Sequence, residues 1–234
     1  MKNIRIVIVS KDESLRMTND FIKQSIFQDD INVTTSIILN NKESICKCYN
    51  TVLDEVRTSA EKYDYVFFMH ADVQTDLNNL ITQVIEHSDK YDVFGLCGCD
   101  KISYGVTPLN WFNGSKQYPE NRWGFVYHGE VNAPTYFSQH SSDVTHHPVS
   151  CIDGLCIIFG PKAIETDMRF DETFMFDHYD TDISFQTIID YDLNLGIIVD
   201  MMLQHWSIGK SITTDSFRNS ELKFREKWDK YFKK

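Results

Sequence analysis

YDYVFFMHADV, residues 63–73, contains an apolar run that stops abruptly at ionisable side chains. The run Tyr65–Met69 has the length and the aromatic, apolar composition of a strand buried in a sheet. His70 and Asp72 follow at its carboxyl end. In open α/β sheets ligands bind at this edge, so the pair predicts a site for a divalent cation and the phosphates that it carries. The alternative is that Asp72 only caps the next helix.

Strand and helix patterns alternate around this segment, which predicts an α/β fold with a mostly parallel central sheet flanked by helices. Strands are expected over Ile4–Ser10, Asn32–Leu39, Tyr65–Met69, Val93–Cys99, Ile152–Gly160 and Gly196–Met202. Helices are expected after Ser10, from Ser44, from Asp76, over Asp180–Tyr191 and over Ser216–Phe232. Residues 100–150, rich in proline and histidine, predict an insertion of loops with a hairpin near Trp123–His128. With no linker or internal repeat, residues 1–234 are predicted to form a single domain.

Composition excludes several classes of protein. The net charge of −11 disfavours nucleic acid as a partner, because nucleic acid requires a basic face. No apolar stretch approaches 18 residues, so no transmembrane segment is predicted. The six cysteines lack the C-x-x-C spacing of zinc sites and are expected to be buried free thiols. Free thiols fit a reducing compartment, so we expect a cytoplasmic protein.

Three groups of ionisable residues lie at predicted element ends. They are His70 with Asp72 after one strand, residues 177–182 at the start of a helix, and His205 after the last strand. Each group alone has a structural interpretation, as a helix cap or as a partly buried histidine. Together they supply a carboxylate and an imidazole for a metal and a second carboxylate as a base. We expect them to converge at one edge of the sheet.

The order of these motifs resembles the family 2 glycosyltransferases of GT-A fold, particularly the StrF-like proteins of streptomycin biosynthesis. The resemblance covers nearly the whole chain outside residues 100–150. The matching stretches are Cys48-Tyr49-Asn50, Met69-His70-Ala71-Asp72-Val73 as an HxD form of the DxD motif, Ile152-Asp153-Gly154-Leu155, Phe170-Asp171-Glu172-Thr173-Phe174, Tyr179-Asp180-Thr181-Asp182-Ile183, His205 and Phe224–Trp228.

The resemblance implies an enzyme that transfers a sugar from a nucleotide-diphosphate sugar to a hydroxyl acceptor such as a glycan, with inversion at the anomeric carbon. Asp72 and His205 would hold Mn²⁺ or Mg²⁺, and the imidazole tilts the choice toward Mn²⁺. Asp180 would be the general base. Asp182 is the second candidate for the base, or it caps the helix.

The resemblance also implies where the substrates bind. Ser10, Asn40, Asn50 and His70 would meet the nucleotide of a UDP, GDP or dTDP donor, and Lys210 would reach the diphosphate or remain a solvated loop charge. Asp153 and Gly154 would contact the acceptor, or Asp153 merely ends a strand; Trp111, in the insertion outside the resemblance, is a further candidate for acceptor contact. The aromatic residues of the insertion, Trp111 among them, form either a substrate wall or a small core beneath a loop.

Two departures from the commoner family pattern leave other functions open. His70 replaces the first aspartate of DxD, and Tyr179 replaces the acid before the base. A module that binds sugar nucleotides or glycans without catalysis is therefore one alternative. A nucleotidyltransferase is another, but Ser10–Ser14 lacks the glycine-rich basic loop that this class requires. The spacing of the motifs does not encode the sugar, the nucleobase, the acceptor or the oligomeric state.

Overall fold

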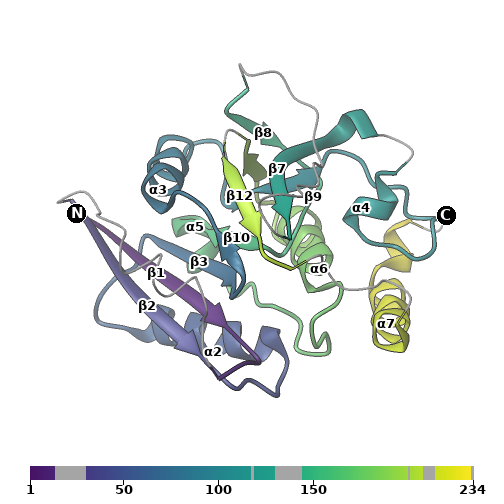
Figure 1. Ribbon diagram of the computed structural model, residues 1–234, viewed down its shortest axis with the longest axis horizontal. Coiled ribbons are helices and arrows are strands. Elements are labelled where there is room, and N and C mark those ends of the chain that lie inside the picture. Colours follow the sequence, from purple (N-terminus) through teal and green to yellow (C-terminus); the bar gives the residue numbers. More distant parts are fainter. Residues whose placement is uncertain (14–29, 117–118, 130–143, 200, 208–213, 233–234) are drawn as a thin grey trace.

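The computed structural model describes residues 1–13, 30–116, 119–129, 144–199, 201–207 and 214–232. The described chain forms two sheets flanked by helices, which confirms the predicted α/β architecture (Figure 1). The helix expected after Ser10 lies outside the described residues, as does Lys210.

The large sheet has seven strands and is mixed, with five strands running in one direction and two in the other. Its order is β2 (Ile31–Ile38), β1 (Lys2–Val9), β3 (Tyr65–His70), β10 (Cys156–Phe159), β5 (Val93–Gly95), β11 (Leu195–Ile198) and β8 (His146–Pro148). The pairs β1·β2, β1·β3 and β5·β11 are parallel, whereas β10 runs antiparallel to both of its neighbours and β8 is antiparallel to β11. The prediction of a mostly parallel sheet is therefore confirmed, with β10 and β8 as the two strands that run in the opposite direction.

The second sheet has five short strands in the order β4 (Val73–Gln74), β12 (Met202–His205), β7 (Arg122–His128), β6 (Cys97–Cys99) and β9 (Cys151–Ile152). Three segments predicted as single strands divide between the two sheets: Val93–Cys99, Ile152–Gly160 and the segment beginning at Gly196. The expected hairpin near Trp123–His128 is instead one strand, β7, between β6 and β12. The insertion thus contributes the central strand of the second sheet.

Two helices begin where the sequence predicts caps. The side chain of Ser44 accepts the amide of Cys46 at the start of α2 (Ile45–Thr58), and Asp76 accepts the amide of Asn79 at the start of α3 (Leu77–Glu86). The others are α4 (Trp111–Gly114), α5 (Pro161–Glu165), α6 (Tyr179–Phe185) and α7 (Asp215–Phe232), with a 3₁₀ turn at Pro119–Asn121. The helix predicted over Asp180–Tyr191 ends at Phe185 and continues as a π-helical turn, Gln186–Asp190.

Alternation along β1 places a hydrophobic core on each side of the large sheet. Ile4, Ile6 and Ile8 are buried on the side covered by α3, and Val7 and Val9 lie on the side covered by α2, α6 and α7. All six cysteines are buried free thiols, which confirms that prediction. Across the described residues, no helix combines the length and the apolar character that crossing a bilayer demands.

Candidate active site

The pairing of β4 with β12 brings Asp72 to His205. Val73, the residue after Asp72, lies opposite His205 in this antiparallel pair, and the Trp206 amide donates to the Asp72 carbonyl at 2.9 Å. Nε2 of His205 lies 3.3 Å from Oδ2 of Asp72. Two short strands in the second sheet therefore join residues that are 133 positions apart in the sequence.

His70, Asp72 and His205 form a cluster with the donor atoms of a metal site. One nitrogen or oxygen from each residue lies within 4.8 Å of the other two. Burial raises the pKa of Asp72, but the hydrogen bond from His205 and the nearby charges of His205 and His70 outweigh it and lower the pKa to about 2. Burial lowers the pKa of His70. The cluster at neutral pH therefore combines an ionised carboxylate with a neutral imidazole at His70, the forms that bind a divalent cation.

The His205 ring forms a hydrogen bond with a second histidine, His128. Its Nδ1 lies 3.0 Å from Nδ1 of His128, the residue that pairs with it on β7. One ring must donate to the other. When His205 donates its Nδ1–H, its Nε2 keeps a lone pair on the side of Asp72 and of Ser207, whose hydroxyl lies 2.8 Å away. A hydrogen bond to the second nitrogen of a metal-binding histidine is the usual way to fix its orientation.

Tyr179 connects His70 to the loop at Gly154. The Tyr179 hydroxyl lies 2.7 Å from Nε2 of His70 and donates to the Gly154 carbonyl at 2.8 Å. Gly154 permits this approach, because a Cβ atom at that position would lie 2.2 Å from the Tyr179 oxygen. Burial raises the pKa of Tyr179, so the phenol remains protonated.

Asp180 follows Tyr179 at the start of α6 and is half-buried. Its Oδ2 accepts the Gly154 amide at 3.2 Å, and its Oδ1 accepts the Thr181 amide at 2.7 Å. Burial, and then the negative charge of Asp153, raise the pKa of Asp180 to about 7. A carboxyl group with this pKa can take up and release a proton near neutral pH, as a general base requires.

Asp153 is held by the indole of Trp111. The Trp111 Nε1–H donates to Oδ2 of Asp153 at 2.5 Å, and the Leu155 amide donates to Oδ1 at 2.9 Å. Trp111 is buried in the core on the α3 side of the sheet. Of the two interpretations given for this residue, the structure places it in the core and in contact with Asp153.

Phe176 lies beside the cluster, and both Phe176 and the preceding residue Met175 are exposed. The Phe176 ring is 42% exposed, and its centroid lies 5.3 Å from that of His70. Met175 is 55% exposed, while its backbone carbonyl accepts the Ile45 amide at the start of α2. An exposed aromatic ring is therefore held next to the cluster, on a backbone that is anchored at Met175.

Two of the four residues expected to bind the nucleotide, Ser10 and Asn40, follow the ends of β1 and β2 on the same edge of the sheet. Ser10 follows Val9, which pairs with His70, and the Asn41 amide donates to the Ser10 carbonyl at 2.9 Å. Asn40 is exposed and has a positive φ of 54°. Both residues thus lie at the edge that carries the cluster.

Two other expected site residues lie inside the protein with their polar groups engaged. Asn50 accepts the amide of Phe170 and donates to its carbonyl, and it also donates to Glu172. Asp182 is fully buried and accepts from Lys227, Trp228 and Gln186. The N-cap position of α6 belongs to His178, so Asp182 does not cap the helix.

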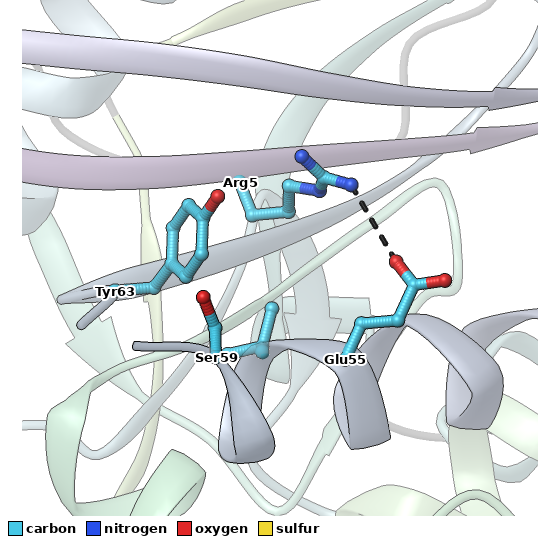
Figure 2. A pocket seen from close by; sticks show the side chains of 5 residues that line it. Arg5, Glu55, Ser59 and Tyr63 are labelled. Carbon is cyan, nitrogen blue, oxygen red and sulfur yellow. Dashed lines mark ion pairs between the residues drawn. The ribbon is translucent and has the colours of Figure 1, made fainter. Parts of the chain in front are cut away.

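A small pocket lies elsewhere, between β1 and the end of α2 (Figure 2). Arg5, Glu55, Val56, Ser59 and Tyr63 line it, and Arg5 faces Glu55 at 3.6 Å. It lies by the first half of β1, whereas His70 pairs with the last residue of that strand and Ser10 follows it. The pocket is thus separate from the cluster.

Sequence reasoning overlooked three residues of the site. His128 lies at the end of the segment expected to form a hairpin but was given no role, and Phe176 carries no motif. Tyr179 had a signal: both departures from the family pattern, His70 and Tyr179, prove to be hydrogen-bond partners. A paired departure of this kind indicates contact between the two positions.

The sequence matches the model of a family described as "Glycosyltransferase like family" over residues 6–231. A search of curated proteins finds no match. Similar solved structures include TarS of S. aureus, with 13% identity and a TM-score of 0.50 over 86% of this chain and 36% of that chain. GalNAc-T7, solved with UDP, GalNAc and Mn²⁺, has 9% identity and a TM-score of 0.54 over 98% of this chain and 49% of that chain. A197 from STIV has 12% identity and a TM-score of 0.49, covering 88% and 85%. The likeness to the first two confirms the predicted GT-A fold, and this chain spans half of their lengths or less.

Proposed function

Because this chain belongs to the glycosyltransferase-like family, we propose that it transfers a sugar from a nucleotide-diphosphate sugar to a hydroxyl acceptor, with a divalent cation and with inversion. The observation that carries the proposal is the link through Tyr179. Its hydroxyl contacts His70 of the metal-type cluster, and the next residue is Asp180, whose pKa suits a base. The cluster and the base are therefore adjacent, as a transfer from a diphosphate requires.

The residues present fit a divalent cation. Asp72 and His205 offer an ionised oxygen and a nitrogen 3.3 Å apart, with His70 completing the cluster. Carboxylate and imidazole together suit Mn²⁺ better than Mg²⁺, which prefers oxygen ligands. When bound, the cation supplies positive charge that stabilises the leaving diphosphate. It also overcomes the general repulsion between a chain of net charge −11 and an anionic donor.

Asp180 takes the proton of the acceptor hydroxyl as the oxygen attacks the anomeric carbon. The bond from that carbon to the diphosphate oxygen breaks on the opposite face, so the configuration inverts. The Gly154 and Thr181 amides hold the two carboxylate oxygens in place. Asp153 sustains the high proton affinity of Asp180 through its negative charge. Ser10 and Asn40 face the donor nucleotide, and the exposed ring of Phe176 offers an apolar surface to a sugar ring.

A thermal-shift panel of UDP, GDP, dTDP and CMP, each with and without Mn²⁺, tests the donor class. A ligand at 100 times its dissociation constant adds about 2.7 kcal/mol to the free energy of unfolding. We expect one nucleotide to stabilise the protein only when Mn²⁺ is present. The matching sugar nucleotide then permits a transfer assay, with the anomeric configuration of the product read by NMR.

The same measurements separate the two other functions. A binding module without catalysis would be stabilised by glycan without nucleotide or metal. A nucleotidyltransferase would form pyrophosphate from a nucleoside triphosphate and a sugar 1-phosphate. Either result would contradict the proposal.

A further inference from the structure

The Tyr179 hydroxyl determines which nitrogen of His70 carries the proton. Its oxygen lies 2.8 Å from the Gly154 carbonyl oxygen, a distance that requires a hydrogen between the two atoms. A carbonyl oxygen carries no hydrogen, so the hydrogen between the two atoms is the single hydroxyl hydrogen of Tyr179. Toward His70, 2.7 Å away, the phenol oxygen can then only accept. This hydrogen-bond pattern assigns the proton of His70 to Nε2 and leaves a lone pair on Nδ1.

Nδ1 is then the His70 atom available to the cluster with Asp72 and His205. We infer that Tyr179 is a positioning residue that holds His70 in the tautomer whose Nδ1 is a third metal ligand. The inference rests on the metal site of the proposed function and extends it. His70 binds the cation rather than only the nucleotide, and the site contains two imidazoles and one carboxylate. Such a donor set favours Mn²⁺ and other transition metals over Mg²⁺.

The surrounding contacts fix this arrangement. The phenol cannot turn away from the carbonyl, because Tyr179 is buried and packs against Tyr49 and Phe170. Leu155 holds the backbone of His70, since its carbonyl accepts the His70 amide at 3.1 Å. The absence of a side chain at Gly154 leaves room for the phenol oxygen. The position of the His70 ring is thus set by residues that do not themselves touch the cation.

The test compares Tyr179→Phe with the wild type by titrating Mn²⁺ into metal-free protein, without nucleotide or acceptor. Loss of the hydrogen bond to a ligating histidine should weaken Mn²⁺ binding about 10–100-fold. Tyr91→Phe is the matched control, because it breaks another tyrosine–histidine hydrogen bond, to Nδ1 of His146 at 2.9 Å. Tyr91 lies near the far end of β10 from His70, and its variant should keep the wild-type affinity.

Pulsed EPR of bound Mn²⁺ gives a readout that a merely structural role of Tyr179 would not move. We expect nitrogen couplings from two imidazoles in the wild type and from one in His70→Ala and in Tyr179→Phe. A wild-type spectrum with a single imidazole overturns the inference without any variant, even where Tyr179→Phe does not fold. Unchanged affinity or two imidazoles in a folded Tyr179→Phe protein overturns it as well.

A double-mutant cycle combines Tyr179→Phe with His70→Asp, because a carboxylate has no tautomer that a hydrogen bond could fix. In that background Tyr179→Phe should leave Mn²⁺ affinity unchanged, whereas an equal loss in both backgrounds would show that Tyr179 acts through packing alone. Since these experiments contain no sugar donor, their outcome is independent of whether sugar transfer occurs. A protein that binds Mn²⁺ through two imidazoles but transfers no sugar would refute only the proposed function.

Discussion

Asp182 and Lys227 form an ion pair in the interior, with a closest N–O distance of 2.8 Å and an Asp182 side chain that is almost inaccessible. Trp228 and Gln186 also donate hydrogen bonds to this carboxylate, so three side chains interact with Asp182. We predict that Asp182→Ala costs about 1–3 kcal/mol in the free energy of unfolding for each buried donor left without an acceptor, the Trp228 indole and the Gln186 amide, whereas Lys227 keeps its ion pair with Asp171. Denaturant unfolding measures this. A stable variant without turnover would instead identify Asp182 as the base.

Asp180→Asn should lower kcat by about 10²–10⁴-fold, because it removes the general base while keeping the shape of the side chain. Donor affinity, measured by titration with Mn²⁺ present, should not change, since the substitution does not touch the metal cluster. Asp190→Asn is the control on the turn that follows α6, where Asp190 accepts from Tyr231 at 3.4 Å. A near-normal rate in Asp180→Asn would exclude Asp180 as the base.

The rate of the wild-type enzyme should rise with pH through about 7, because Asp180 must be deprotonated to accept the acceptor's proton. The pH profile of kcat, measured with saturating donor and Mn²⁺, checks this. A rise centred near 4, the ordinary range of an aspartate, would show that the environment of Asp180 does not raise its pKa in the working enzyme.

The raised pKa of Asp180 should also make stability depend on pH, in the opposite direction to the rate. The pKa of Asp180 is higher in the folded protein than in the unfolded chain, so between about 4 and 7 the folded state binds more protons. Stability from this group therefore falls as pH rises through that window. We expect metal-free Asp180→Asn to melt at a higher temperature than the wild type at pH 8, with the difference vanishing near pH 4. Calorimetry at both pH values measures it.

Asp72→Ala should abolish Mn²⁺ binding, because it removes the only carboxylate of the cluster. Titration calorimetry on metal-free protein measures the loss. Asp76→Ala, four residues along the chain, is the control: it removes the cap of α3, costs about 1 kcal/mol of stability and should leave the metal affinity intact. Retained Mn²⁺ affinity in Asp72→Ala would place the metal elsewhere.

Asn50→Ala distinguishes a structural from a nucleotide-binding asparagine. Its side chain satisfies both the amide and the carbonyl of Phe170, so we predict a loss of about 1–3 kcal/mol in stability with unchanged nucleotide affinity. A selective loss of nucleotide binding in a stable protein would restore Asn50 to the donor site.

How far the sequence determines the fold depends on the length of each element. The long strands β1, β2 and β3 and the capped helices α2 and α3 were predictable, because each contains enough residues to show a period. The second sheet was not, because strands of two to four residues such as β4, β9 and β12 show no alternation. His205 was expected after a strand and lies within one, for this reason.

The site shows the same limit. Ionisable residues at strand ends indicated that His70, Asp72 and His205 would meet, since the topology of α/β sheets brings such ends together. Nothing in the pattern showed that Asn50 and Asp182 would be engaged inside the protein, because polar residues of the same type serve catalysis and packing alike. Only the partners of each side chain separate those roles.

The position of β10 beside β3 determines how the chain can be divided into fragments. This strand closes the open side of β3, with Cys156 opposite Met69, while His205 comes from still later in the chain. A fragment that ends before residue 150 would carry the HxD segment on an uncovered sheet edge, prone to self-association. Splitting the gene there should give two inactive halves, and activity should return only where the halves recombine.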